Sequence, residues 1–176
     1  MGVAFADLNG DFKPDVVTAN QTDETVSVFP GDGDGTLGGR RDYAVGPGPI
    51  AVAVADLNGD RAPDLATANL DGDTVSVLAN RGDGTFHRRR TYWAGEDSPD
   101  GLAIGDLNGD RKPDLAVTSG DADSGTFSWL RNAIGLCVVP NLRGRTYRPE
   151  GGRFRAPGAA WARSVASTRV PSRGAV

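Results

Sequence analysis

The stretch that decides the fold reads Asp56-Leu57-Asn58-Gly59-Asp60-Arg61-Ala62-Pro63-Asp64, and close copies of it occur twice more in the chain. The first copy occupies residues 7–15 and the third occupies residues 106–114, so successive copies are 49 and 50 residues apart. Internal repetition marks a chain built from repeated structural units, and a period near 50 fits one four-stranded blade of a β-propeller. The 176 residues therefore contain three such units.

A run of alternating large and small residues precedes each copy. In the second unit this run is Val52-Ala53-Val54-Ala55, and the other units have the same pattern at residues 3–6 and 102–105. Alternation with a period of two is the signal of a β-strand. One face of large side chains and one of small side chains suits sheets that stack against neighbours around a crowded axis.

Three more strand signals follow each of the first two copies, and two follow the third. In the second unit they lie at residues 65–69, at residues 74–78 and near residues 88–94, with a Gly-Asp-Gly-Thr hairpin turn before the last. No helical periodicity is visible. We therefore predict an all-β fold of three four-stranded β-propeller-type blades, a partial propeller, followed by an irregular C-terminal tail.

The composition changes after Asn132, where the repeat ends. We predict repeats over residues 1–132, divided at about 1–49, 50–99 and 100–132. This part has 22 acidic and 11 basic side chains, and such an acidic body repels nucleic acid. Residues 133–176 have eight Arg and one acid, and we predict a basic, low-complexity, disordered tail. No apolar run is long enough to predict a membrane span.

The nine-residue loop offers the oxygen ligands that Ca²⁺ prefers. Side chains at positions 1, 3, 5 and 9 and the backbone carbonyl of position 7 would converge on the ion, and Gly at position 4 permits the tight curl. Without a cation, the three carboxylates of a loop would repel one another. The predicted ligands are Asp7, Asn9, Asp11, Lys13 and Asp15; Asp56, Asn58, Asp60, Ala62 and Asp64; and Asp106, Asn108, Asp110, Lys112 and Asp114.

The loop allows two other interpretations. An EF-hand requires flanking helices, Gly at position 6 and Glu at position 12, whereas position 12 here is Thr18, Thr67 or Val117. Metal-free turns rich in Asp and Asn use similar residues. Three copies in register favour the calcium interpretation.

Nothing in the sequence indicates catalysis. His87 is the only histidine, and it lies beside three arginines with no partner that would make it a general base. Cys137 is the only cysteine, and no His or Lys lies near it in sequence to lower its pKa. We therefore expect a protein that is not an enzyme.

The loop, the segment Leu65-Ala66-Thr67-Ala68-Asn69 and the segment Gly82-Asp83-Gly84-Thr85-Phe86 together resemble FG-GAP/VCBS-type repeats. The resemblance implies blades related to the propeller of integrin α-subunits, with the loop joining the first two strands of a blade and binding calcium. It also implies an extracellular or cell-surface location. The Phe-Gly and Gly-Ala-Pro tags of integrins are absent, which weakens any inference of an integrin-like ligand.

Two functions follow from the resemblance. The first is a non-catalytic calcium-binding module for adhesion, for binding a protein or glycan ligand, or for scaffolding. The alternative is a fragment of an enzyme-associated propeller in a secreted carbohydrate-active protein, which would need non-repeated His, Tyr, Arg or acidic residues gathered on one face. Because closed propellers have 4–8 blades, we expect further blades from a longer chain or an oligomer.

Overall fold

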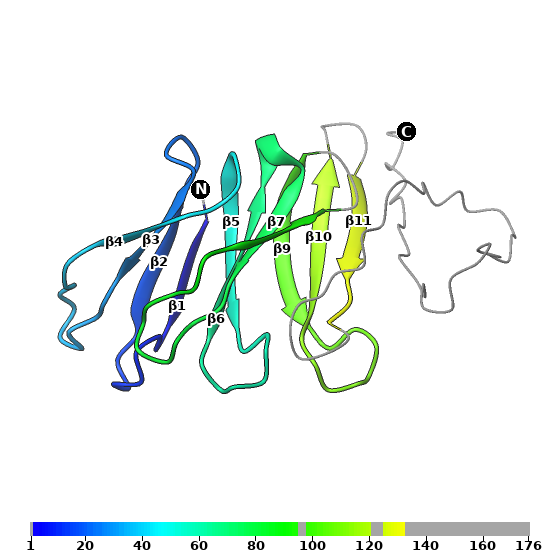
Figure 1. Ribbon diagram of the computed structural model, residues 1–176. Coiled ribbons are helices and arrows are strands. Elements are labelled where there is room, and N and C mark those ends of the chain that lie inside the picture. Colours follow the sequence, from blue (N-terminus) through cyan, green and yellow to red (C-terminus); the bar gives the residue numbers. More distant parts are fainter. Residues whose placement is uncertain (1, 95–97, 121–124, 133–176) are drawn as a thin grey trace, which may run out of the picture.

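Three antiparallel sheets stand in a row in chain order in the computed structural model, which describes residues 2–94, 98–120 and 125–132 (Figure 1). The first sheet has the order β1-β2-β3-β4 and the second has the order β5-β6-β7-β8. The third sheet has the order β11-β10-β9. Each strand is therefore hydrogen-bonded to the strand that follows it within its sheet.

The strand boundaries agree with the alternating runs of the sequence. The first sheet consists of β1 (Val3–Ala6), β2 (Asp15–Asn20), β3 (Thr25–Phe29) and β4 (Arg41–Ala44). The second consists of β5 (Pro49–Ala55), β6 (Asp64–Asn69), β7 (Thr74–Leu78) and β8 (Arg90–Trp93), with a 3-10 turn η1 (Leu70–Gly72) after β6. The third consists of β9 (Pro99–Gly105), β10 (Asp114–Gly120) and β11 (Gly125–Leu130).

The prediction of an all-β fold made of blade-type sheets is confirmed. In the third unit, the described residues contain three strands, and the fourth strand predicted for it falls outside them. The predicted tail at residues 133–176 also lies outside the described residues. Within the part of the chain that is described, no helix is long and apolar enough to cross a membrane.

The same strand register recurs in all three sheets. Phe5 of β1 lies opposite Val16, Val54 of β5 lies opposite Leu65, and Ile104 of β9 lies opposite Leu115. Because side chains alternate along a strand, equal register places equivalent residues on equivalent faces. The three sheets can therefore be compared position by position.

The hydrophobic core lies between the sheets. One buried cluster joins the first and second sheets and the other joins the second and third, so the second sheet is covered on both faces. The first cluster contains Leu8, Val17, Val26, Val28, Val45, Leu65, Leu78 and Phe86, with Val52 and Val54 packed against it. The second cluster contains Leu57, Ala66, Val75, Val77, Ala94, Leu115, Val117 and Leu130, with Leu102 and Ile104 packed against it.

Two buried asparagines tie neighbouring sheets together. The Asn80 Nδ2 atom donates hydrogen bonds to the Leu8 carbonyl of the preceding unit at 2.8 Å and to the Pro63 carbonyl of its own unit at 3.0 Å. The Asn132 Nδ2 atom likewise donates to the Leu57 carbonyl at 2.6 Å. The bonds to the Leu8 and Leu57 carbonyls each join a nine-residue loop to the unit that follows it, so the loops form part of the contacts between sheets.

Candidate metal centre

Each nine-residue loop curls around the carboxylate at its first position. In the first loop, the Asp7 carboxylate accepts backbone N–H groups from Gly10 at 2.7 Å, Asp11 at 3.1 Å and Phe12 at 2.8 Å. The loops that begin at Asp56 and Asp106 have the same three bonds, with lengths within 0.1 Å of these. The repeated sequence therefore gives a repeated backbone geometry.

The side chains at positions 3 and 5 take part in the same curl. In the second loop, the Asn58 Oδ1 atom accepts the N–H of Asp60 at 2.8 Å, and the Asp60 Oδ1 atom accepts the N–H of Ala62 at 2.8 Å. The first and third loops have the same bonds. The structure thus brings the oxygens of positions 1, 3 and 5 into one turn of chain, where the N–H of position 5 bonds to both position 1 and position 3. The residue at position 7 closes the turn through its N–H.

Positive φ angles at two positions make the curl possible. Position 4 is Gly in every loop, with φ between +78° and +85°. Position 6 also has positive φ although it is not glycine, at Phe12, Arg61 and Arg111. Residues other than glycine are uncommon in the left-handed region of φ and ψ. Here, the hydrogen bond from each position-6 N–H to the position-1 carboxylate holds the residue in that conformation.

The carboxylate at position 9 is buried in the protein, and in the third loop it also accepts a hydrogen bond from the position-3 side chain, from Asn108 Nδ2 to Asp114 Oδ2 at 2.9 Å. Asp15, Asp64 and Asp114 are at most 1% exposed. The two Asp64 oxygens accept the N–H groups of Leu57 at 2.9 Å and Asn80 at 2.8 Å, and the equivalent bonds hold Asp15 and Asp114. Position 9 therefore joins the start of the loop to the chain just after the third strand of the sheet.

This structural role was missed from the sequence. The spacing of a ligand motif shows which residues carry oxygen, but it does not show which backbone N–H groups those oxygens face. Burial raises the pKa of Asp64 to about 6, the neighbouring Asp60 and Asp56 carboxylates add to the rise, and the two N–H bonds act in the opposite direction. At the first position of the third loop, the N–H groups of Arg111, Gly109 and Asp110 instead lower the pKa of Asp106, the bond from Arg111 having the largest effect.

The donor chemistry of the loops fits calcium. Every predicted ligand is a carboxylate, amide or carbonyl oxygen, as a hard cation requires. An oxygen that accepts one N–H retains a further lone pair, so these hydrogen bonds do not exhaust the donors. Within the described chain, no three His, Cys, Asp or Glu side chains converge closely enough to hold an ion. A calcium ion in one of these loops would therefore need Asn and carbonyl oxygens in addition to the carboxylates.

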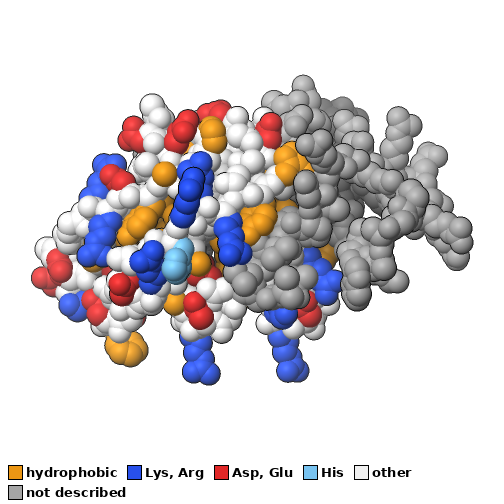
Figure 2. Space-filling model, viewed as in Figure 1, with side chains coloured by type: hydrophobic (Ala, Val, Ile, Leu, Met, Phe, Trp, Pro, Cys, Tyr) orange, Lys and Arg blue, Asp and Glu red, His pale blue; other side chains and the backbone are white. Residues whose placement is uncertain are grey.

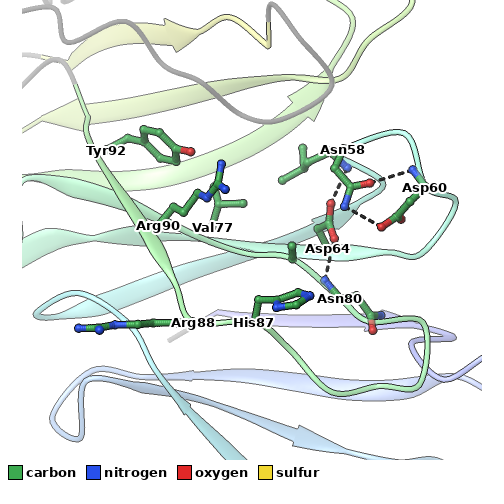
Figure 3. A pocket seen from close by; sticks show the side chains of 11 residues that line it. Asn58, Asp60, Asp64, Val77, Asn80, His87, Arg88, Arg90 and Tyr92 are labelled. Atoms are coloured by element: carbon green, nitrogen blue, oxygen red, sulfur yellow. Dashed lines mark hydrogen bonds between the residues drawn. The ribbon is translucent and has the colours of Figure 1, made fainter.

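A pocket of about 450 Å³ lies beside the second loop (Figure 3). Asn58, Asp60 and Asp64 line one side of it, and basic side chains, among them Arg88 and Arg90, line the other. In Figure 2 the single histidine of the chain lies among blue Lys and Arg side chains on this face. The pocket therefore places an acidic loop opposite a basic strand.

The first interface shows which group fills the equivalent place there. Tyr43 contacts Phe86 of the second unit edge to face, with ring centroids 5.1 Å apart, and its hydroxyl donates to the Gly84 carbonyl at 3.4 Å. The equivalent of Tyr43 in the second sheet is Tyr92, which lines the pocket. The sequence did not predict this pocket, although the residues that line it all belong to the second unit, because it does not show how the loop and the last strand of a unit lie against each other.

Comparison with protein families assigns the repeat. The model of the FG-GAP-like repeat matches residues 7–67 and residues 56–117. Each match begins at one nine-residue loop and extends past the next, and together the two matches cover more than half of the chain. A comparison with curated proteins gives no match. On the family match and the repeated sheets, the chain belongs to the FG-GAP-like repeat family.

Proposed function

We propose that the chain is a non-catalytic calcium-binding repeat module that acts in adhesion or in binding a protein or glycan ligand outside the cell. The observation that carries the proposal is the threefold recurrence of one loop geometry around oxygen-bearing side chains. A fold that needed only turns at these places would not require two carboxylates, at positions 1 and 5, in one turn of chain, where they repel one another. Calcium would offset this repulsion.

Calcium in this proposal acts first on the structure. The Asn80 and Asn132 side chains bond to carbonyls inside the loops, so an ordered loop gives the next sheet a fixed partner. An ion bound only by the folded chain stabilises it by mass action. Extracellular calcium modules have dissociation constants of about 10⁻⁴–10⁻³ M, which suits a module that stays loaded outside the cell.

The pocket beside the second loop is where we place a ligand. Arg88 and Arg90 favour an acidic group, such as the carboxylate of a glycan or a protein, and a cation in the second loop would add to that attraction. This part of the proposal is tested by replacing Arg88 and Arg90 with Gln. The variant is expected to lose binding to acidic glycans on an array while keeping its calcium stoichiometry. Equal glycan binding by both proteins would contradict this placement.

Isothermal titration calorimetry of the metal-free chain with CaCl₂ tests the calcium proposal, and it is expected to give three ions per chain. Asp60→Asn keeps an oxygen for the Ala62 N–H and removes one ligand charge, so it is expected to lower the stoichiometry to two or to weaken one site. Asp83→Asn is the matched control, because Asp83 lies in an exposed hairpin turn outside the loops. No calcium heat, or an equal effect of both variants, would contradict the proposal.

A further inference from the structure

One face of the first sheet exposes large apolar side chains in an ordered strand. Val3 is 56% exposed and Phe5 is 67% exposed, and Val16 and Phe29 beside them are half-buried. We call these four residues the leading face. Isolated apolar residues on a surface are ordinary, but a contiguous apolar face on a sheet marks an interaction site.

The repeat shows what covers such a face. The equivalent residues of the second sheet are Val52, Val54, Leu65 and Leu78, and these pack against the first sheet. The equivalent residues of the third sheet are Leu102, Ile104, Leu115 and Leu130, and these pack against the second sheet. In both cases, the partner is the opposite face of another sheet of the same kind.

That opposite face is also partly exposed, among the described residues, at the other end of the row. In the third sheet it contains Ala103, Gly105, Leu107, Phe127 and Trp129, which we call the trailing face. Leu107 is 50% exposed, whereas its equivalents Leu8 and Leu57 are each 1% exposed within the two cores. The chain therefore has both halves of a sheet-to-sheet contact.

The sizes of the side chains match across this contact. Val54 joins the same cluster as Ala6 at the first interface, and Ile104 joins the same cluster as Ala55 at the second. In a contact between the two end sheets, the equivalent pair is Phe5 and Gly105. Phe5 is the largest residue at its position in the three sheets, and Gly105 is the smallest at its position. A Cβ placed on Gly105 would meet no atom within 4 Å, so there is space beside it.

We propose that two copies of this chain associate head to tail, the leading face of each packing on the trailing face of the other. Two rows of three sheets give a ring of six, within the 4–8 blades of closed propellers, and the ring satisfies both faces of both copies. This inference goes beyond the calcium proposal and does not depend on it. Gly31, the equivalent of Asn80 and Asn132, has no side chain to reach the Leu107 carbonyl, so the contact between copies rests on apolar packing.

Sedimentation velocity of the full chain across a range of concentrations tests this proposal, with calcium and with a chelator in parallel. The expected result is a concentration-dependent species with twice the 18.3 kDa chain mass. Phe5→Arg is expected to give a monomer. Phe12→Arg is the matched control, because Phe12 is exposed at a loop tip where the other repeats have Arg, and it should still dimerise.

Ala103→Arg tests the trailing face and is also expected to give a monomer. Circular dichroism of each variant checks that its sheets are intact. A wild-type chain that stays monomeric at every concentration would overturn the proposal. So would a dimer that survives either Phe5→Arg or Ala103→Arg, or a wild type that forms an open series of larger species. Loss of calcium binding with an intact dimer would contradict only the proposed function.

Discussion

At the scale of single residues, the carboxylates of one loop have two different roles. The carboxylates at positions 1 and 5 accept the N–H groups that curl the chain, whereas the carboxylate at position 9 is buried and holds two backbone N–H groups. The two roles can be separated by mutation in the absence of metal.

Asp64→Ala is expected to destabilise the metal-free protein far more than Asp60→Ala. Losing Asp64 leaves the buried N–H groups of Leu57 and Asn80 without an acceptor, at a cost of about 1–3 kcal/mol each. Asp60 is exposed, and water can replace it, so its loss should cost below about 1 kcal/mol. Urea unfolding of both variants measures this, and equal losses would show that position 9 has no special structural role.

The raised pKa of Asp64 predicts a pH dependence of the metal-free fold. Its folded pKa of about 6 lies above the unfolded value of about 4, so the folded chain binds the proton more tightly. Its contribution to the free energy of unfolding is therefore full below about pH 4 and is lost as the pH rises toward 6. Urea unfolding of metal-free protein at several pH values should show this slope, and Asp64→Asn should remove part of it. Identical slopes in the two proteins would contradict the assignment.

At the scale of the strands and loops, the sequence predicted the strands well because two independent patterns mark the same residues. The two-residue alternation marks strands such as β5 (Pro49–Ala55), and the 50-residue repeat places equivalent strands in every sheet. The contacts between units were not predictable in this way. Asn80 was visible as part of a repeated Leu-x-Asn, but nothing in its spacing shows that its amide reaches the Leu8 carbonyl of another unit.

Asn80→Ala is expected to lower the free energy of unfolding by about 1–3 kcal/mol. The substitution removes donors to two backbone carbonyls, Leu8 and Pro63, at the contact between sheets. Asn58→Ala is the control, since its Nδ2 atom bonds only to the exposed Asp60 carboxylate and its loss should cost less without metal. Chemical denaturation of the metal-free variants compares the two, and a larger effect of Asn58→Ala would contradict the role of Asn80.

At the scale of the whole molecule, stability comes from contacts between sheets. Both hydrophobic clusters contain residues from two sheets, so a sheet buries apolar surface mainly against its neighbour. The alternation of large and small residues predicted such stacking from the sequence. It could not predict which faces stay open, because the equivalent residues Phe5 and Val54 are both large and apolar and differ only in what lies next to them.

Equivalent leucines should therefore differ sharply in their contribution to stability. Leu57→Ala empties a site between the second and third sheets and is expected to cost about 2–5 kcal/mol. Leu107→Ala, at the equivalent position of the third sheet, removes a half-exposed side chain and should cost under about 1 kcal/mol in the monomer. Urea unfolding at low protein concentration makes the comparison. Similar losses would show that the sheets do not stack as described.

If calcium stabilises the row of sheets through its three loops, thermal melting of the chain with calcium and with a chelator will show it. At a tenfold excess of calcium over the dissociation constant, each site contributes about 1.4 kcal/mol, and three sites contribute about 4 kcal/mol. We expect a rise in Tm on the order of 10 °C in calcium, reversed by chelator. The same Tm in calcium and in chelator would contradict it.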